Sequence, residues 1–164
     1  MAWAKSGSTT LTSTGDALIV SGFTPSTFHV YLYHNLVTGG EMTEYMTAGS
    51  GGTKDTGSNY ANRRSANFGS DSTYTSRANM VVAAKSGATT PEFGFGYIAN
   101  VSSEEKLFIT YHANASSAGA GTATETSNTA GKHAQTSADL DVVSFDNTGT
   151  GDFNTDTNLS VLGG

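Results

Sequence analysis

The chain has 164 residues, a formal net charge of −6, no cysteine and 13% charged residues. Its eight lysines and arginines cannot form the basic patch that phosphate binding needs, so a nucleic-acid partner is excluded. No apolar run approaches the ~18 residues of a membrane span, which excludes a membrane partner, and the N-terminal MAWAKSGSTT lacks the apolar segment of a Sec signal peptide.

Small polar residues dominate the composition, with 20 Ser, 25 Thr and 20 Gly. Seven Tyr and eight Phe accompany them, whereas disordered chains are poor in aromatic residues. Thr and aromatic side chains suit the pleated surface of a sheet, so the composition favours strands. The length and the absence of a linker predict one domain, residues 1–164.

Short apolar runs bounded by Gly, Asn, Asp or Ser recur along the chain and predict eight or nine strands. In chain order they are Asp16–Phe23, which a Thr-rich run precedes, then Phe28–His34, Glu41–Met46, Met80–Ala83, Glu92–Ile98, Lys106–Tyr111, Asp139–Phe145 and Asn158–Leu162. Two long connections are expected, over residues 48–79 and 113–138. No amphipathic helix of ordinary length is evident, so the predicted fold class is all-β, an antiparallel two-sheet jelly roll or β-sandwich.

Period-two alternation predicts which side chains face the core. Within Glu92–Ile98, Gly94 and Gly96 lie opposite three aromatic residues and allow another part of the chain to approach closely. The first and last apolar strands, with Val20 and Val161, are expected to share one sheet. The side chains predicted to be buried are Leu18, Val20, Val30, Leu32, Phe95, Leu107, Ile109, Val142 and Val161.

The residues that could carry catalysis show no recognisable pattern. His29, His34, His112 and His133 have no zinc-motif spacing. No serine lies in a nucleophile-elbow sequence and no Gly-rich loop matches a phosphate-binding pattern. The pairs Glu41/Glu44 and Glu104/Glu105 are interpreted as solvated carboxylates. We therefore predict a protein that is not an enzyme and needs no cofactor.

Asp152, Asn154 and Asp156 offer oxygen ligands at alternate positions, as a calcium loop does. The segment lacks the Gly and Glu that an EF-hand requires at its sixth and twelfth positions. Asn and Asp are also common in ordinary turns. A turn is the favoured interpretation, and a calcium site is the alternative.

The segment from Gly57 to Ser72, continuing to Asn79, is the most distinctive in the chain. Aromatic residues alternate in it with Asn, Ser and Arg, a mixture that suits contact with a partner. The alternative is a long connection pinned by its aromatic residues to the sandwich edge. The predicted contact residues are Tyr60, Arg63, Arg64, Phe68, Tyr74 and Arg77, of which the arginines are candidates for ion pairs to an acidic partner or are simply solvated.

Three stretches taken in order resemble small virion proteins of tailed bacteriophages. They are Gly57–Arg64 with Gly69–Ser72 after it, Asn114–Gly121, and Asn147–Phe153 before Leu159–Gly163. The resemblance runs from Thr9 to the end of the chain. It implies a jelly-roll-like domain on the phage particle and does not distinguish the capsid from the tail.

This resemblance leads us to expect a non-enzymatic capsid decoration protein, a component of the virion that is assembled in the host cytoplasm. Its expected partners are the major capsid protein and further copies of itself, with a trimer favoured because it matches local threefold positions of the shell. The alternative is a tail-fibre or receptor-binding module that holds a host-surface glycan on aromatic side chains such as Tyr31, Tyr33 or Tyr60. A free carbohydrate-binding module is a third class, disfavoured because no signal peptide would export it.

Overall fold

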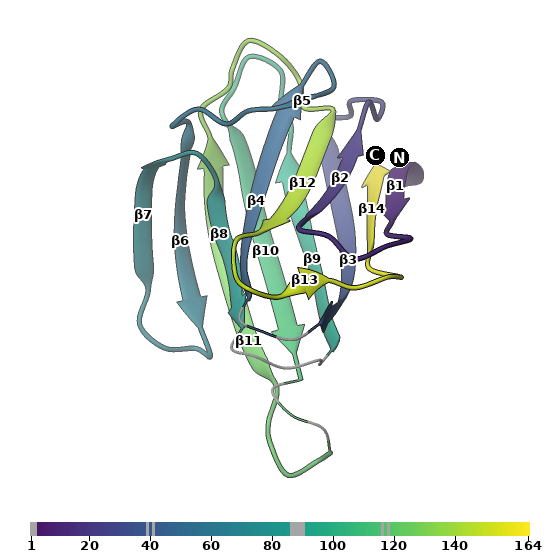
Figure 1. Ribbon diagram of the computed structural model, residues 1–164. Coiled ribbons are helices and arrows are strands. Elements are labelled where there is room, and N and C mark those ends of the chain that lie inside the picture. The colour runs from purple at the N-terminus through teal and green to yellow at the C-terminus, as the bar shows by residue number, and fades with distance from the viewer. Residues whose placement is uncertain (1–2, 39, 41, 86–90, 116, 118) are drawn as a thin grey trace.

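The computed structural model describes residues 3–38, 40, 42–85, 91–115, 117 and 119–164. These residues form fourteen strands and no helix, and the strands pair antiparallel in two sheets that pack together (Figure 1). The predicted fold class, an all-β antiparallel sandwich of the jelly-roll kind, is confirmed. None of the described residues belongs to a helix that could cross a membrane.

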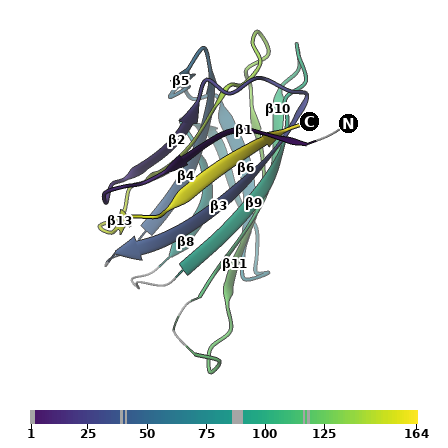
Figure 2. The same ribbon diagram turned by 90° about the vertical axis from the view of Figure 1, so that its right-hand side faces the viewer.

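The larger sheet has nine strands. Their order is β1 (Ala4–Thr10), β14 (Asn158–Gly163), β3 (Phe28–Thr38), β9 (Pro91–Ala99), β10 (Lys106–Asn114), β11 (Glu125–His133), β6 (Tyr60–Ala66) and β7 (Ser72–Arg77), with β13 (Asp152–Phe153) also paired to β3. Figure 1 shows the β6–β7 hairpin at one edge of this sheet and the two chain ends together at the other. Figure 2 views the same molecule from the side of β1, β14 and β3.

The smaller sheet has five strands and lies in front of the larger one in Figure 1. Its order is β2 (Ala17–Ser21), β12 (Val142–Asn147), β4 (Met42–Ser50) and β5 (Thr53–Lys54), with β8 (Met80–Lys85) also paired to β4. The β12 segment Val-Val-Ser-Phe is buried on both faces of this sheet.

The prediction of two long connections is wrong. Strands β5, β6 and β7 lie within residues 48–79, and β11 lies within residues 113–138. These strands consist mainly of Thr, Ser, Asn and charged residues, so they carry too few apolar side chains to show a period of two. The backbone ladder and the β-branched Thr residues favour the extended conformation there.

The core between the sheets is rich in aromatic rings. The Tyr33 ring stacks on Phe145 with 4.6 Å between ring centroids, and Tyr31 meets the same ring edge-on at 5.2 Å. Stacked and T-shaped arrangements are the favourable ones for aromatic pairs. Burial is as predicted for Leu18, Val20, Val142 and Val161.

Burial of the other five predicted core residues is wrong. They are turned to the outer side of the larger sheet, where they are exposed or only half-buried: Val30, Leu32, Phe95, Leu107 and Ile109. The predicted alternation of side chains between the two faces was correct in each strand, but the face predicted to meet the core is the one that points outward. A shift of one residue exchanges every side chain between the two faces.

The expectation that Val20 and Val161 share one sheet is also wrong. Val20 lies on β2 in the smaller sheet and Val161 on β14 in the larger one. The first strand of the structure is β1, which occupies part of the Thr-rich run and pairs antiparallel with β14, so that Ala4 lies opposite Gly163. The chain crosses between the sheets after β1, which separates β2 from β14.

Candidate functional site

Three adjacent central strands of the larger sheet carry large apolar side chains on the face turned away from the core, in addition to Ile98 and Phe108, which face the core. Leu32 on β3 is 41% exposed, Phe93 and Tyr97 on β9 are 51% and 54% exposed, and Leu107 and Ile109 on β10 are 55% and 66% exposed. Scattered exposed apolar residues are normal on a protein surface, but adjacent ones over several strands mark a contact surface.

The strand register arranges these side chains in cross-strand rows, because directly paired residues lie on the same face. We call this set the outer face. Its four rows across β3, β9 and β10 are Phe28–Ala99–Leu107, Val30–Tyr97–Ile109, Leu32–Phe95–Tyr111 and His34–Phe93–Ala113. With strands ~4.8 Å apart and alternate residues ~6.8 Å apart, the rows cover roughly 300–400 Å², the size of the largest apolar patch on a typical monomer, which is often functional.

Polar residues border the outer face on the side of β11 and β6. The register continues the rows from Ile109 to Ala130 and Arg63, and from Tyr111 to Asn128 and Ser65. An apolar centre with a polar rim is the usual anatomy of a protein interface.

A hollow of about 400 Å³ lies where the apolar rows meet this border. Arg63 lines it beside an ion-pair partner, Asp71, at 3.7 Å. The side chains that line it from the outer face include Phe95, Tyr97 and Tyr111.

The six predicted contact residues do not form one surface. The contact role of Tyr60 is wrong, because the side chain is 1% exposed and its hydroxyl donates to the Ala48 carbonyl at 2.7 Å. Arg64 is half-buried and donates through Nε to Ser127 Oγ at 2.8 Å, so it is held within the structure. Side chains alternate between the two faces of a strand, and Tyr60 and Arg64 lie on the same side of β6. This shared side explains why both are removed from solvent.

The other four predicted contact residues reach solvent to different degrees. Arg63 is exposed at the border of the outer face, and Phe68 is 76% exposed at the tip of the β6–β7 hairpin. Tyr74 is half-buried and Arg77 is exposed, both on β7. The structure therefore brings Arg63 to the outer face and leaves Phe68 apart from it.

The proposed glycan-holding tyrosines are buried, which makes that assignment wrong. Tyr31, Tyr33 and Tyr60 are each at most 1% exposed, so their ring faces are not available to a sugar. Their hydroxyls instead satisfy buried polar partners, as tyrosines in protein interiors usually do.

The segment with the calcium candidates forms a tight turn. Asn154 Oδ1 accepts a hydrogen bond from the Thr155 backbone N–H at 2.8 Å, and Asp156 adopts a left-handed conformation with φ 68°. Asx residues are common in such turns because they cap their own backbone and tolerate this conformation. The turn accounts for Asn154 and Asp156, whereas Asp152 lies in the short strand β13, which pairs with β3.

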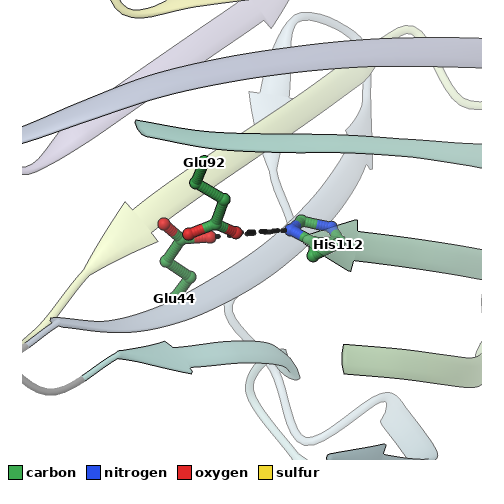
Figure 3. Close-up of side chains that lie close together, drawn as sticks. All are labelled: Glu44, Glu92 and His112. Atoms are coloured by element: carbon green, nitrogen blue, oxygen red, sulfur yellow. Dashed lines mark hydrogen bonds and ion pairs between the residues drawn. The ribbon is translucent and has the colours of Figure 1, made fainter. Parts of the chain in front are cut away.

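A second candidate site is a buried polar cluster between the two sheets. Glu44 on β4, Glu92 on β9 and His112 on β10 are each at most 2% exposed. Figure 3 shows both carboxylates directed at the imidazole ring. His112 Nδ1 lies 2.9 Å from Glu92 Oε1 and 3.8 Å from Glu44 Oε2.

Further hydrogen bonds hold the cluster in place. Glu44 Oε1 accepts from the Tyr33 hydroxyl at 3.0 Å and from Asn35 Nδ2 at 3.1 Å. His112 Nε2 lies 3.1 Å from the Tyr31 hydroxyl. The buried Tyr, His and Asn side chains of β3 and β10 therefore surround this cluster with polar partners.

Glycine on β9 makes room for the rings. A Cβ at position 94 would lie 2.8 Å from His112 Nδ1, and one at position 96 would lie 2.3 Å from the Tyr31 ring. Gly94 and Gly96 are paired across the sheet with His112 and Tyr31. The expectation that these glycines allow a close approach is confirmed.

Burial sets the ionisation of the cluster. Burial raises the pKa of the Glu44 carboxyl well above its usual range, and the nearby Glu92 carboxylate raises it further. Burial also lowers the pKa of His112 to about 4, against an opposing effect of Glu44. At neutral pH the His112 imidazole is therefore uncharged, and the raised pKa of Glu44 reflects the cost of an isolated charge in the core.

Sequence reasoning missed this cluster and placed Glu44 among the solvated carboxylates, which is wrong. A signal was present, because Glu44 shares a period-two face with Met42 and Met46, which are both buried. The contact of Glu44 with Glu92 and His112 joins residues from three strands, and no spacing motif records it.

Comparisons of the chain with protein-family models, curated proteins and solved structures find no match.

Proposed function

We propose that this protein is a non-enzymatic virion component that binds the phage head through its outer face, as a capsid decoration protein does. The carrying observation is the set of large apolar side chains on the outer side of β3, β9 and β10. On β10, Leu107 and Ile109 are exposed, although the buried face of the same strand holds Lys106 and His112 beside Phe108. Selection for stability alone would place the apolar side chains inside. Apolar side chains on an outer sheet face are favoured when a partner covers them.

The size of the outer face supports a contact that is weak for each copy. Its roughly 300–400 Å² of apolar surface is about half of the ~800 Å² per partner in a standard interface. A decoration protein gains its hold from many copies and neighbouring contacts, so a modest area suffices. We include a symmetric assembly in the proposal, with a trimer at the local threefold positions of the shell.

The phage setting rests on the resemblance of the sequence segments given above. The polar border supports a role for Arg63 in binding the partner. Arg63 is 3.7 Å from Asp71 in an exposed ion pair, and it can leave Asp71 to pair with an acidic group of the major capsid protein. Exposed ion pairs contribute little on their own, so we assign most of the binding to the apolar rows.

The test is co-sedimentation of the purified chain with phage heads that lack it. The double variant Leu107→Asp/Ile109→Asp places charge on the outer face and should reduce binding at least tenfold. Phe68→Asp, a matched change of an exposed apolar residue at the hairpin tip, should bind as the original chain does. Loss of binding with Phe68→Asp alone would move the contact to the hairpin and contradict the proposal.

A glycan-binding role on the tail is the second candidate, and the hollow beside Arg63 favours it. Phe95, Tyr97 and Tyr111 supply ring surface there, and Asn128 and Asp71 supply hydrogen-bonding groups. An apolar hollow with a few polar groups is the usual form of a small-ligand site. Adsorption of the phage to its host would then fail when the protein is deleted, while heat resistance of the heads would stay unchanged.

A further inference from the structure

The donor atoms of Glu44, Glu92 and His112 lie close enough together to share one metal ion. One ligand atom from each side chain lies within 4.8 Å of the other two. His112 Nδ1 is 2.9 Å from Glu92 Oε1 and 3.8 Å from Glu44 Oε2. Ligands of a tetrahedral zinc ion with bonds of about 2.0–2.1 Å are about 3.3 Å apart, a value between these two distances. Small side-chain shifts would therefore bring the donors around an ion.

The second oxygen of Glu44 points to a missing positive partner. Glu44 is 0% exposed, and its Oε2 atom is buried with no hydrogen-bond donor. The Oε1 atom, by contrast, accepts hydrogen bonds from both Tyr33 and Asn35. These two bonds fix the carboxylate so that Oε2 faces His112. A buried acceptor without a donor is costly, and either a proton shared with the neighbouring Glu92 carboxyl or a cation would remove that cost.

The surroundings of His112 have the arrangement usual for a metal-bound histidine. Such a histidine holds a hydrogen bond on the ring nitrogen that is not the ligand. Here Nε2 lies 3.1 Å from the Tyr31 hydroxyl, which leaves Nδ1 directed at the carboxylates. The absence of a side chain at Gly94 lets the His112 ring pack against β9 and take this orientation, since a Cβ there would lie 2.8 Å from Nδ1.

We propose that Glu44, Glu92 and His112 bind a divalent transition-metal ion, Zn²⁺ by preference, between the two sheets. The imidazole nitrogen selects for metals of this kind, whereas Ca²⁺ takes six to eight oxygen ligands, about twice the number of ligands that three side chains supply. The three side chains supply three of the four ligands of a tetrahedral ion, and a second carboxylate oxygen or a water molecule would complete the set. Because the three side chains are buried, the proposed role of the ion is to stabilise the fold. The site joins β4 of the smaller sheet to β9 and β10 of the larger one.

The test measures metal content and thermal stability of the full chain. The protein is refolded in EDTA, in Zn²⁺ or in Ca²⁺, and excess metal is removed before analysis. In the samples freed of excess metal we expect about one zinc per chain and no retained calcium. In separate samples that keep free Zn²⁺ at a hundred times its Kd, the Tm should rise by roughly 5–10 °C relative to EDTA. Co²⁺ in place of Zn²⁺ should give visible d–d absorption bands.

Two matched pairs of variants assign the ligands. Glu44→Gln keeps the acceptor for Tyr33 and Asn35 but should lose the bound zinc, whereas Glu105→Gln, at an exposed glutamate, should retain it. His112→Asn should also lose the metal, whereas His29→Asn, at another buried histidine, should retain it.

Either of two results would overturn the proposal. One is an original chain that retains no zinc, has the same Tm in Zn²⁺ and EDTA and gives no Co²⁺ bands, a result that does not depend on the folding of any variant. The other is a folded Glu44→Gln protein that keeps its zinc in full.

Discussion

The two faces of strands β3, β9 and β10 differ in a way that is unusual for a sandwich. The inner face holds tyrosines, glycines, Glu92 and His112 together with the apolar Ile98 and Phe108, while the outer face holds Phe, Leu, Ile and Tyr side chains. The inner face is held together by aromatic packing and by hydrogen bonds such as the 2.9 Å contact of His112 with Glu92. The comparison indicates that the inner face stabilises the fold, and we propose that the outer face serves a partner.

Two phenylalanines, one packed against the inner face and one on the outer face, test most strongly whether the inner face alone stabilises the fold. Phe145 is fully buried against Tyr31 and Tyr33, so Phe145→Ala should lower the free energy of unfolding by about 3–5 kcal/mol. Phe93 is 51% exposed on the outer face, so Phe93→Ala should cost about 1 kcal/mol or less. Urea unfolding of both variants measures the difference, and equal costs would mean that the outer face also carries stability.

Two glycines test the packing of the inner face. An added methyl group at Gly96 would lie 2.3 Å from the Tyr31 ring, so Gly96→Ala should lower stability by about 1–3 kcal/mol. Gly121 has no atom within 4 Å of such a methyl group, so Gly121→Ala should change stability by less than about 1 kcal/mol and in the stabilising direction. Urea unfolding measures both variants. An unchanged free energy of unfolding for Gly96→Ala would show that the core accommodates the added methyl group without cost.

A single change on the outer face should leave the fold intact. Ile109 is 66% exposed and Thr has a similar preference for strands, so Ile109→Thr should change the free energy of unfolding by about 0.5 kcal/mol or less. The variant should elute earlier than the original chain from a hydrophobic-interaction column. A loss of several kcal/mol would instead show that Ile109 packs within its own chain.

The smallest expected effect concerns His29 on the inner side of β3. Burial lowers the pKa of His29 below its ordinary value of 6.5, and its Nε2 accepts a hydrogen bond from the Ser26 N–H at 3.1 Å. The unfolded chain therefore takes up the proton at a higher pH than the folded one, and the stability due to His29 is lost as the pH falls below 6.5. Chemical denaturation between pH 7 and pH 5 should show a steeper loss for the original chain than for His29→Asn. Equal losses of the free energy of unfolding in the original chain and in His29→Asn would contradict the assignment of this pH dependence to His29.

The fold class could be predicted from the sequence because alternation and composition both act locally. Leu18 and Val20 illustrate this, since they alternate with exposed neighbours in β2 and are buried as expected. Gly94 and Gly96 likewise indicated a close approach, which His112 and Tyr31 make.

The orientation of the central strands could not be predicted in the same way. In β3, one face carries Phe28, Val30 and Leu32 and the other carries Tyr31 and Tyr33, so both faces are bulky. Which one meets the core depends on partners in other strands, such as Phe145 of β12, which stacks on Tyr33. The same dependence on distant strands hid the buried cluster of Glu44, Glu92 and His112.

The central claim, that a partner covers the outer face, is tested most directly by hydroxyl-radical footprinting of the free and the particle-bound chain. Phe93, Tyr97 and Leu107 are all more than half exposed in the single chain and should react readily when it is free. On the particle they should be protected several-fold, while Phe68 at the hairpin tip should react as before. Unchanged labelling of the three outer-face residues, with protection of Phe68, would contradict the claim.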